Sequence, residues 1–444
     1  MTSHLDLLDT LLAKARAAGA DQADALVVAR ESQSASVRLG VQEALDRSET
    51  TDIGLRVFVG ASTASASSSD LSGDALDLMV QNAIDMARAG PPDPFACLAP
   101  EARLYRSDET DEVDDAQPNA DDDIARALEA EEAARAIDGV TNSQGAGAGW
   151  SRSTVALATT GGFSGTKQAS SYSVSAAVLA QGDSGMERDY AAHSTRFLED
   201  LEPADLVGRK AGERAVARRN PKSMETGPMP VVFDKRVSAS LISQFASAIN
   251  ASAIARGTSF LQDAMDAQVF TKGLTIVDDP HLHRGARSRR FDGEGVAAQR
   301  MELVRDGVLQ SWLLDCATAK QLELETTGHA ARGTSGSPSP STSNLYLEAG
   351  DISVEALLKD VGSGLLVTEM IGMGVNPVTG DYSRGASGFA IVDGALAYPV
   401  SGLTVAGNLK DMFLAMTPAD DLEFRYGTNA PTLRIDGMTV AGDA

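Results

Sequence analysis

The chain of 444 residues is poor in several residue types on which whole classes of protein depend. Its two cysteines, Cys97 and Cys316, lie far apart and lack the spacing of metal-ligand pairs. A disulfide scaffold, a cysteine-rich zinc ribbon and an iron–sulfur cluster are therefore excluded. No run of about 18 apolar residues occurs, so we expect no membrane-spanning helix. The first residues also lack the basic and apolar regions of a secretory signal, and we expect a cytoplasmic protein.

Positive charge is scarce as well. The chain has 38 Lys and Arg against 62 Asp and Glu, a formal net charge of −24. Nucleic acids and anionic membranes are bound through Lys and Arg, so neither is an expected partner. The short basic segment 284–290 is the best local exception. Hydrophobic residues make up 43%, which is enough for a sizeable core.

Hydrophobic periodicity, glycine and proline divide the chain into two predicted domains near residue 222. Asn220-Pro221 and Pro228-Met-Pro230 mark the boundary, because proline ends a preceding helix. Residues 1–221 carry helical patterns at 3–18, 74–89, 122–137 and 203–219. They also carry strand-like runs at 25–29, 36–39 and 54–59, a Ser/Ala-rich segment at 61–69 interpreted as a strand, and two paired strands across 140–180.

Residues 222–444 begin with a helical pattern at 235–254, and the pattern after it predicts mostly β-sheet. Strand-like runs cover residues 274–277, 295–305, 308–314, 345–347, 364–368, 386–392, 397–400, 403–406 and 432–435. Asp306-Gly307 and Asp393-Gly394 each separate two such runs, which is a strong hairpin signal. The predicted fold class is α+β, with an N-terminal mixed α/β domain (1–221) followed by an antiparallel, sheet-dominated C-terminal domain (222–444).

His281-Leu-His283 is the best metal candidate from spacing alone. On an extended segment both imidazoles would face one side, and Asp278, Asp279 or Glu294 could supply the third ligand of a catalytic zinc. The neighbouring proline, glycine and arginines instead indicate a turn in which both histidines are partly exposed.

Two further motifs have an ordinary structural interpretation. The acidic segment 107–123 lacks the central glycine of a calcium loop and is interpreted as a solvated loop. Gly182-Asp-Ser184-Gly185 resembles a serine-protease loop, but that mechanism needs a histidine, and only His4 precedes the serine. A turn capped by the aspartate is favoured.

Four blocks of the C-terminal half resemble the TldD/PmbA family, and specifically its PmbA (TldE) branch. The block that begins at Asn376 and contains Gly-Asp-Tyr-Ser-Arg-Gly is the most specific. The N-terminal Gly54-Leu-Arg-Val-Phe-Val-Gly also fits, so the resemblance spans nearly the whole chain. The blocks are Asp279-Pro-His-Leu-His-Arg-Gly285 with Arg290-Phe-Asp-Gly-Glu-Gly295, Gly307-Val-Leu-Gln-Ser-Trp-Leu-Leu-Asp315 with Thr327-Gly-His-Ala330, Asn376-Pro-Val-Thr-Gly-Asp-Tyr-Ser-Arg-Gly385, and Tyr398-Pro-Val with Thr404-Val-Ala-Gly-Asn-Leu-Lys-Asp-Met412.

The resemblance implies a heterodimer that cleaves unfolded or extended peptides. The TldD subunit resembles a zinc metallopeptidase, with a His-Glu-x-x-x-His helix and a cysteine ligand near its C-terminus. The TldE subunit lacks these ligands. Aligned on Arg256-Gly-Thr-Ser259, the motif falls here at Ile242-Ser-Gln-Phe-Ala-Ser247, and segment 422–429 holds no cysteine. We therefore expect no catalytic residue, metal or cofactor in this chain, and zinc in the partner subunit.

Three hypotheses remain open. The first is a non-catalytic partner of a TldD-like metallopeptidase subunit. The second is a stand-alone homodimeric peptide-binding module, and the third is a hydrolase that uses His281, His283 and a carboxylate. Asp381, Tyr382 and Arg384 are candidate groove or interface residues, because two glycines bracket them in a predicted tight turn and Tyr and Arg are favoured anchors at interfaces. Local pairing of Asp381 with Arg384 is the structural alternative.

Overall fold

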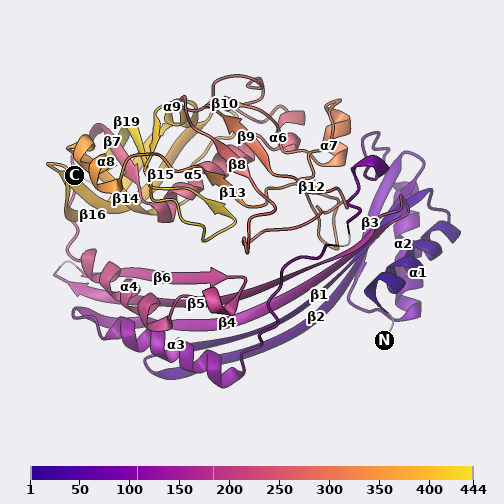
Figure 1. Cartoon of the computed structure of the whole chain (residues 1–444), viewed down its shortest axis with the longest axis horizontal. Coiled ribbons are helices and arrows are strands. Elements are labelled where there is room, and N and C mark those ends of the chain that lie inside the picture. Colours follow the sequence, from indigo (N-terminus) through magenta and orange to yellow (C-terminus); the bar gives the residue numbers. More distant parts are fainter. Residues whose placement is uncertain (1–2, 108, 184, 443–444) are drawn as a thin grey trace.

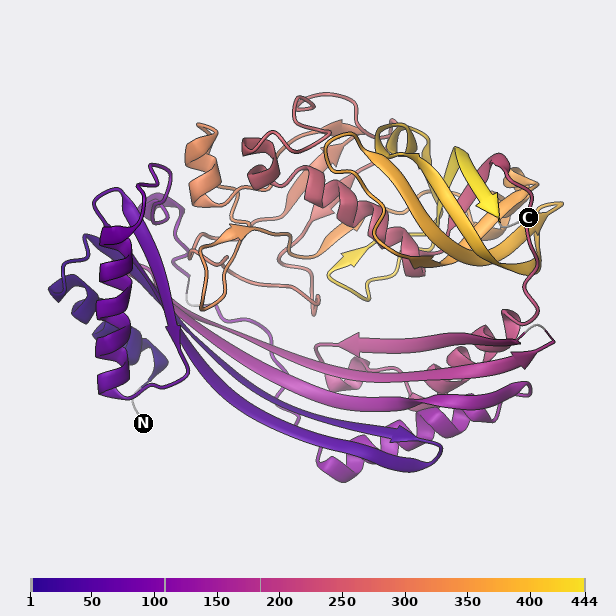
Figure 2. The same cartoon turned by 180° about the vertical axis from the view of Figure 1, so that it is seen from behind.

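The computed structural model describes residues 3–107, 109–183 and 185–442. Asp108 of the acidic segment and Ser184 of the predicted turn lie outside this part. The fold combines helices with extensive sheet, as the sequence predicts. Figures 1 and 2 show a long, curved sheet built by the first half of the chain, with the second half lying along its inner side. No helix in the described ranges has the length and apolarity needed to cross a membrane.

The first sheet has six antiparallel strands in the order β3-β2-β1-β4-β5-β6. The strands are β1 (Gln22–Arg38), β2 (Val41–Val59), β3 (Ser62–Ser68), β4 (Val140–Thr159), β5 (Ser164–Gly182) and β6 (Gly185–Thr195). The Ser/Ala-rich strand and the pair across 140–180 are confirmed. The runs predicted at 25–29 and 36–39 are both strand up to Arg38, but they belong to one strand, because β1 pairs with β2 and β4 along nearly its whole length and stays extended through its polar middle.

Two helix pairs cover this sheet at opposite ends (Figure 1). Helices α1 (His4–Ala17) and α2 (Gly73–Ala89) form one core with β1 and β2. Helices α3 (Ala120–Arg135) and α4 (Ala204–Ala217) form another with β4, β5 and β6. Ser3 and Asn119 begin α1 and α3 with capping boxes. In each box the side chain of the cap residue accepts a hydrogen bond from the backbone N–H three residues later, and the side chain of that later residue accepts one from the backbone N–H of the cap.

The C-terminal half is built around a six-stranded sheet in the order β16-β15-β14-β7-β19-β17. An additional β16–β19 pairing joins the two sides of this sheet into a closed ring of strands. Most pairs in this sheet are antiparallel, whereas β7–β14 is parallel. The strands are β7 (Gly227–Phe233), β14 (Gly364–Ile371), β15 (Asp381–Val392), β16 (Ala395–Asn408), β17 (Met416–Pro418) and β19 (Leu433–Gly442).

A smaller five-stranded sheet, in the order β10-β9-β8-β13-β18, and a two-stranded pair, β11-β12, complete this half. Both predicted hairpins are confirmed: positive φ at Asp306 and Gly307 joins β9 to β10, and the same at Asp393 and Gly394 joins β15 to β16. The strands are β8 (Ile276–Asp278), β9 (Met301–Arg305), β10 (Val308–Leu309), β11 (Ala330–Ala331), β12 (Ser339–Pro340), β13 (Leu345–Leu347) and β18 (Thr428–Asn429).

Helix α5 (Lys235–Ala248) lies at the centre of the C-terminal core. The single helix predicted at 235–254 is wrong, because the backbone of Leu313 bonds to Ile249 and Ala251 and interrupts it. Asn250 then caps the short α6 (Ala251–Ala255). The remaining helices are α7 (Cys316–Gln321), α8 (Val354–Val361) and α9 (Leu409–Leu414), with short 3-10 turns at Glu101–Arg103 and Leu198–Asp200.

Candidate functional site

A cleft runs between β6 and the C-terminal half. Its central cavity, of about 290 Å³, is bordered by β6, α4, the start of α5 and the segment 423–430. A second cavity continues along 193–196 toward the turn at 282–286, and a third lies between the first half of α5, β14 and β15. Arg425 and Tyr426 border the central and second cavities, and Tyr190 and Arg236 border the central and third. The three cavities therefore adjoin one another in a row, which we call the cleft.

Strand β6 presents its backbone edge to this cleft. It is the outermost strand of the first sheet and pairs with β5 (Figure 1). The Tyr190 carbonyl accepts a hydrogen bond from Arg214 Nη1 at 3.2 Å, so the backbone groups of this residue point away from β5. Alternate residues of an unbroken antiparallel pair point the same way, so those of Ala192 and Ser194 face the cleft too. Residues 190–195 border the cavities in succession.

The two carboxylates of the central cavity are held by cations. Glu202 lies 2.9 Å from Lys210 Nζ and also pairs with Arg425. Glu423 lies 2.6 Å from Arg425 Nε and 3.0 Å from Lys235 Nζ. Partial burial acts to raise the pKa of Glu423, but hydrogen bonds from Arg425 and Lys235 outweigh it and lower the pKa to about 2. Both carboxylates thus remain ionised and serve to position the basic side chains.

Helix α5, which carries the aligned segment 242–247, lies beside segment 422–429, the other segment to which the resemblance assigns a lost zinc ligand. Ser238 Oγ of α5 donates a hydrogen bond to the Ala430 carbonyl at 3.2 Å, next to segment 422–429. Ile242 and Phe245 are fully buried in the core, so their side chains do not reach the cleft. In the described part of the chain, no three His, Cys, Asp or Glu side chains are grouped to hold a metal ion. The residues present at these positions do not fit a zinc ion.

His281 and His283 have separate partners. His281 Nε2 lies 3.0 Å from the Ala298 carbonyl, whereas His283 Nδ1 lies 3.2 Å from Glu112 Oε1 and its side chain is 75% exposed. Of the three carboxylates weighed as a third ligand, Asp278 and Glu294 are bound elsewhere. Asp279 Oδ1 accepts a hydrogen bond from the backbone N–H of His281 at 2.8 Å. The structure therefore does not bring the weak metal candidates together, and residues 280–288 form the turn that the proline and glycine indicate.

The predicted turn at Gly380 lies at the start of β15, and its three candidate residues differ in position. Asp381 is exposed and bonds to Thr379 and Asn408, so it does not pair with Arg384. Arg384 Nε donates to the Gly372 carbonyl at 2.9 Å, and the side chain borders the third cavity of the cleft. Tyr382 is only 2% exposed, because β15 turns it into the C-terminal core. The expectation that the turn presents Tyr382 is therefore wrong, while Arg384 does reach the cleft.

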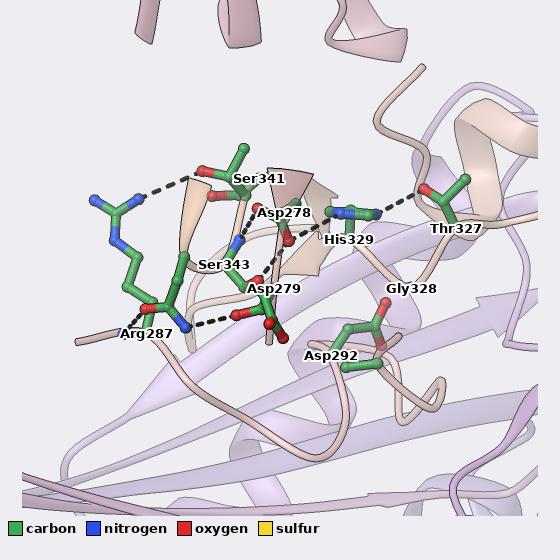
Figure 3. Close-up of polar contacts among 12 residues, drawn as sticks. Asp278, Asp279, Arg287, Asp292, Thr327, Gly328, His329, Ser341 and Ser343 are labelled. Atoms are coloured by element: carbon green, nitrogen blue, oxygen red, sulfur yellow. Dashed lines mark hydrogen bonds and ion pairs between the residues drawn. The ribbon is translucent and has the colours of Figure 1, made fainter. Parts of the chain in front are cut away.

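A buried polar cluster that sequence reasoning missed joins the end of β8 to the segments that precede β11 and β13 (Figure 3). Asp278 Oδ2 lies 3.2 Å from His329 Nε2, and Asp278 accepts hydrogen bonds from both the backbone and the hydroxyl of Ser343. His329 Nδ1 lies 2.9 Å from Thr327 Oγ1. Burial acts to raise the pKa of Asp278, but His329 and Ser343 lower it overall. Nucleophilic catalysis needs the histidine between serine and aspartate, whereas here Asp278 lies between the other two, so the cluster is structural.

A second missed cluster joins the two halves of the chain. Asp24 and Arg56 face each other across β1 and β2, with Arg56 Nε 2.9 Å from Asp24 Oδ2. Arg332 of the C-terminal half also pairs with Asp24, and Glu294 Oε1 lies 4.0 Å from Arg56 Nη2. Burial and the charge of Asp292 raise the pKa of Glu294 to about 7. The sequence signal was a charged residue with apolar neighbours on both sides in each strand, Ala23-Asp24-Ala25 in β1 and Leu55-Arg56-Val57 in β2.

Comparison with known proteins finds one family along the chain. Residues 23–87, 114–219 and 226–442 match, in turn, domain 1, the central domain and the C-terminal domain of the PmbA/TldA metallopeptidases. The chain is 35% identical to "Metalloprotease PmbA" of Escherichia coli O157:H7, over 95% of this chain and 92% of that protein. It is 34% identical to "Metalloprotease PmbA homolog" of Haemophilus influenzae, over 92% and 90%.

Solved structures show the same fold. A protein of Bacteroides thetaiotaomicron superposes with a TM-score of 0.91 at 27% identity, covering 100% of both chains. TldE from Thermococcus kodakarensis superposes with a TM-score of 0.89 at 18% identity, covering 98% of this chain and 100% of that one.

Proposed function

Because the chain belongs to the TldD/PmbA family of metallopeptidases, we propose that it is the non-catalytic, TldE-like subunit of a cytoplasmic peptidase. A TldD-like partner subunit would hold the catalytic zinc, and this chain would bind the unfolded or extended peptide substrate. The residues of this chain at the positions of the zinc ligands support a non-catalytic role beside a zinc-binding partner. The aligned segment 242–247 carries no His or Glu, and segment 422–429 carries no cysteine. Where the start of α5 and segment 422–429 border the cleft, they place Lys235, Glu423 and Arg425, which pair with one another.

The edge of β6 is the observation that carries the peptide-binding part of the proposal. An extended peptide can add to an exposed strand edge through main-chain hydrogen bonds, which are independent of its sequence. The backbone groups of Ala192 and Ser194 face a cleft that runs the length of residues 190–195. The C-terminal half on the other side of the cleft would exclude a folded domain, so selection of unfolded chains follows.

A surface next to Arg384 supports the presence of a partner chain. Ile371, Met373 and Val378 expose 59%, 98% and 52% of their surface, although all three are apolar. Arg384 lies beside the first two through its bond to Gly372, the residue between them. Neighbouring exposed apolar side chains beside an arginine are typical of protein interfaces. A TldD-like subunit would cover this surface in the proposed complex, and a second copy of the chain would cover it in the homodimer alternative.

Size-exclusion chromatography of the chain, alone and mixed with a TldD-like subunit, tests the assembly. We expect a mixed dimer, and a persistent homodimer would favour the stand-alone module. Peptidase assays on an unfolded peptide test the division of labour: we expect no cleavage by the chain alone and chelator-sensitive cleavage by the mixture. One tightly bound zinc per isolated chain, or chelator-insensitive cleavage by that chain, would contradict the non-catalytic role.

A further inference from the structure

The central cavity has a charge opposite to that of the chain as a whole. Five basic side chains border it, against the two carboxylates of Glu202 and Glu423. The whole chain instead carries 62 acidic against 38 basic residues. Such local reversal attracts a ligand of negative charge to this cavity, although the net charge of the whole chain repels it. The five are Lys210, Arg214, Lys235, Arg236 and Arg425.

Arg214 is the member of this set whose charge is not balanced. Lys210, Lys235 and Arg425 pair with the two cavity carboxylates, and Arg236 Nη2 lies 2.8 Å from Asp189 Oδ1. Arg214 Nη1 instead bonds to a neutral group, the Tyr190 carbonyl, and no carboxylate of the described residues lies within 4.0 Å of its guanidinium. Burial and the adjacent charge of Arg236 lower the pKa of Arg214, and the charges of Asp189 and Asp234 offset this only in part.

We infer that the cleft prefers extended peptides with an acidic side chain, which Arg214 binds beside the edge of β6. This inference rests on the proposed peptide-binding function and adds the chemistry of the substrate. A guanidinium forms charge-assisted, often bidentate hydrogen bonds with a carboxylate. The bond to the Tyr190 carbonyl places Arg214 at the strand edge itself, where the peptide backbone would lie.

The carboxylate is that of an internal Asp or Glu side chain, because the cleft continues on both sides of the central cavity. The second cavity extends it past His193 and Ser194, and the third extends it past Tyr190 toward Arg384. A chain passing through would place an internal residue, and not its terminus, beside Arg214.

Fluorescence anisotropy with labelled, unstructured peptides tests this preference on the full chain. The peptides form matched pairs in which internal Asp and Glu are replaced by Asn and Gln, each made with a free and an amidated C-terminus. We expect the acidic member to bind about tenfold more tightly, with the preference reduced at high salt, and C-terminal amidation to have no effect. Equal affinity for the acidic and neutral members would overturn the inference while leaving the proposed function intact.

Arg214→Gln should remove most of the acidic preference, measured as the ratio of the affinities for the acidic and neutral members of a pair, and Arg214→Lys should restore part of it. Arg209→Gln is the matched control: it removes the same charge from α4, but Arg209 pairs with Asp205 at the surface, and the preference should persist. Melting curves establish that each variant is folded. A preference that survives in folded Arg214→Gln, or one that depends on the peptide's C-terminal carboxylate, overturns the assignment. Failure of every peptide to bind would instead overturn the proposed function.

Discussion

Replacing Glu294 by glutamine should stabilise the protein, and increasingly so as the pH rises. The side chain is buried where the first sheet meets the C-terminal half, with Arg56, Asp24, Arg332, Asp292 and the two cysteines as its ionisable neighbours. Glu294 Oε2 accepts a hydrogen bond from the Cys316 backbone at 2.8 Å, whereas Oε1 has no hydrogen-bond partner among the described residues. A glutamine oxygen can keep the first bond without burying a charge.

The magnitude follows from the pKa of Glu294, which rises from an ordinary 4.5 to about 7 through burial and the charge of Asp292. Below pH 4.5 the carboxyl is protonated in both the folded and the unfolded chain and has no effect. Between pH 4.5 and about 7 the unfolded chain releases the proton while the folded chain retains it, so the stability falls as the pH rises. At about 1.4 kcal/mol per pH unit, the penalty reaches roughly 3 kcal/mol above pH 7.

Urea and thermal unfolding of the wild type and Glu294→Gln should therefore be compared between pH 5.5 and 8.5, above the isoelectric point near 4.6. The gain in free energy of unfolding should grow from about 1 kcal/mol at pH 5.5 to about 3 kcal/mol at pH 8.5. Glu325→Gln is the control, because Glu325 is 87% exposed and pairs with Arg103 at the surface. That variant should change stability by less than about 1 kcal/mol. A gain that is independent of pH, or a loss at pH 8.5, would refute the reasoning.

Three further substitutions probe packing and the cleft. In Gly208→Ala the new Cβ would lie 2.1 Å from the Ala130 carbonyl, so α4 must move away from α3. The free energy of unfolding should fall by about 1–3 kcal/mol. Gly73→Ala is the control and should show no loss, because its new Cβ meets open space. Tyr382→Phe should keep the melting temperature, since the buried hydroxyl has no partner among the described residues. Tyr382→Ala should lower the free energy of unfolding by about 3–5 kcal/mol, because it removes a buried ring. Equal losses in the two variants would contradict this. Arg384→Ala should change the free energy of unfolding by no more than about 0.5 kcal/mol, but it should lower the affinity for a TldD-like subunit or for peptide. Binding assays in which both affinities are fully retained would exclude the interface role.

Local sequence signals determined the elements whose causes are local. Hydrophobic periodicity and caps located the helices at residues 3–18 and 74–89 within one or two residues, and Asp-Gly located both hairpins. Such elements depend on side chains within about one turn of each other, which the sequence displays directly. The family resemblance likewise depended on contiguous blocks, and it located both α5 and segment 422–429, which meet at the cleft.

Tertiary structure alone decided the features that depend on pairing between distant segments. Strand β1 stays extended through its polar middle because β2 and β4 bond to it from both sides, and Leu313 divides the helix predicted at 235–254. The register that places Asp24 opposite Arg56 created the buried charge cluster, and the turn of β15 into the core buried Tyr382. The cleft exists because β6 is the last strand of its sheet, an order that follows from backbone hydrogen bonding across the sheet, which no local sequence pattern specifies.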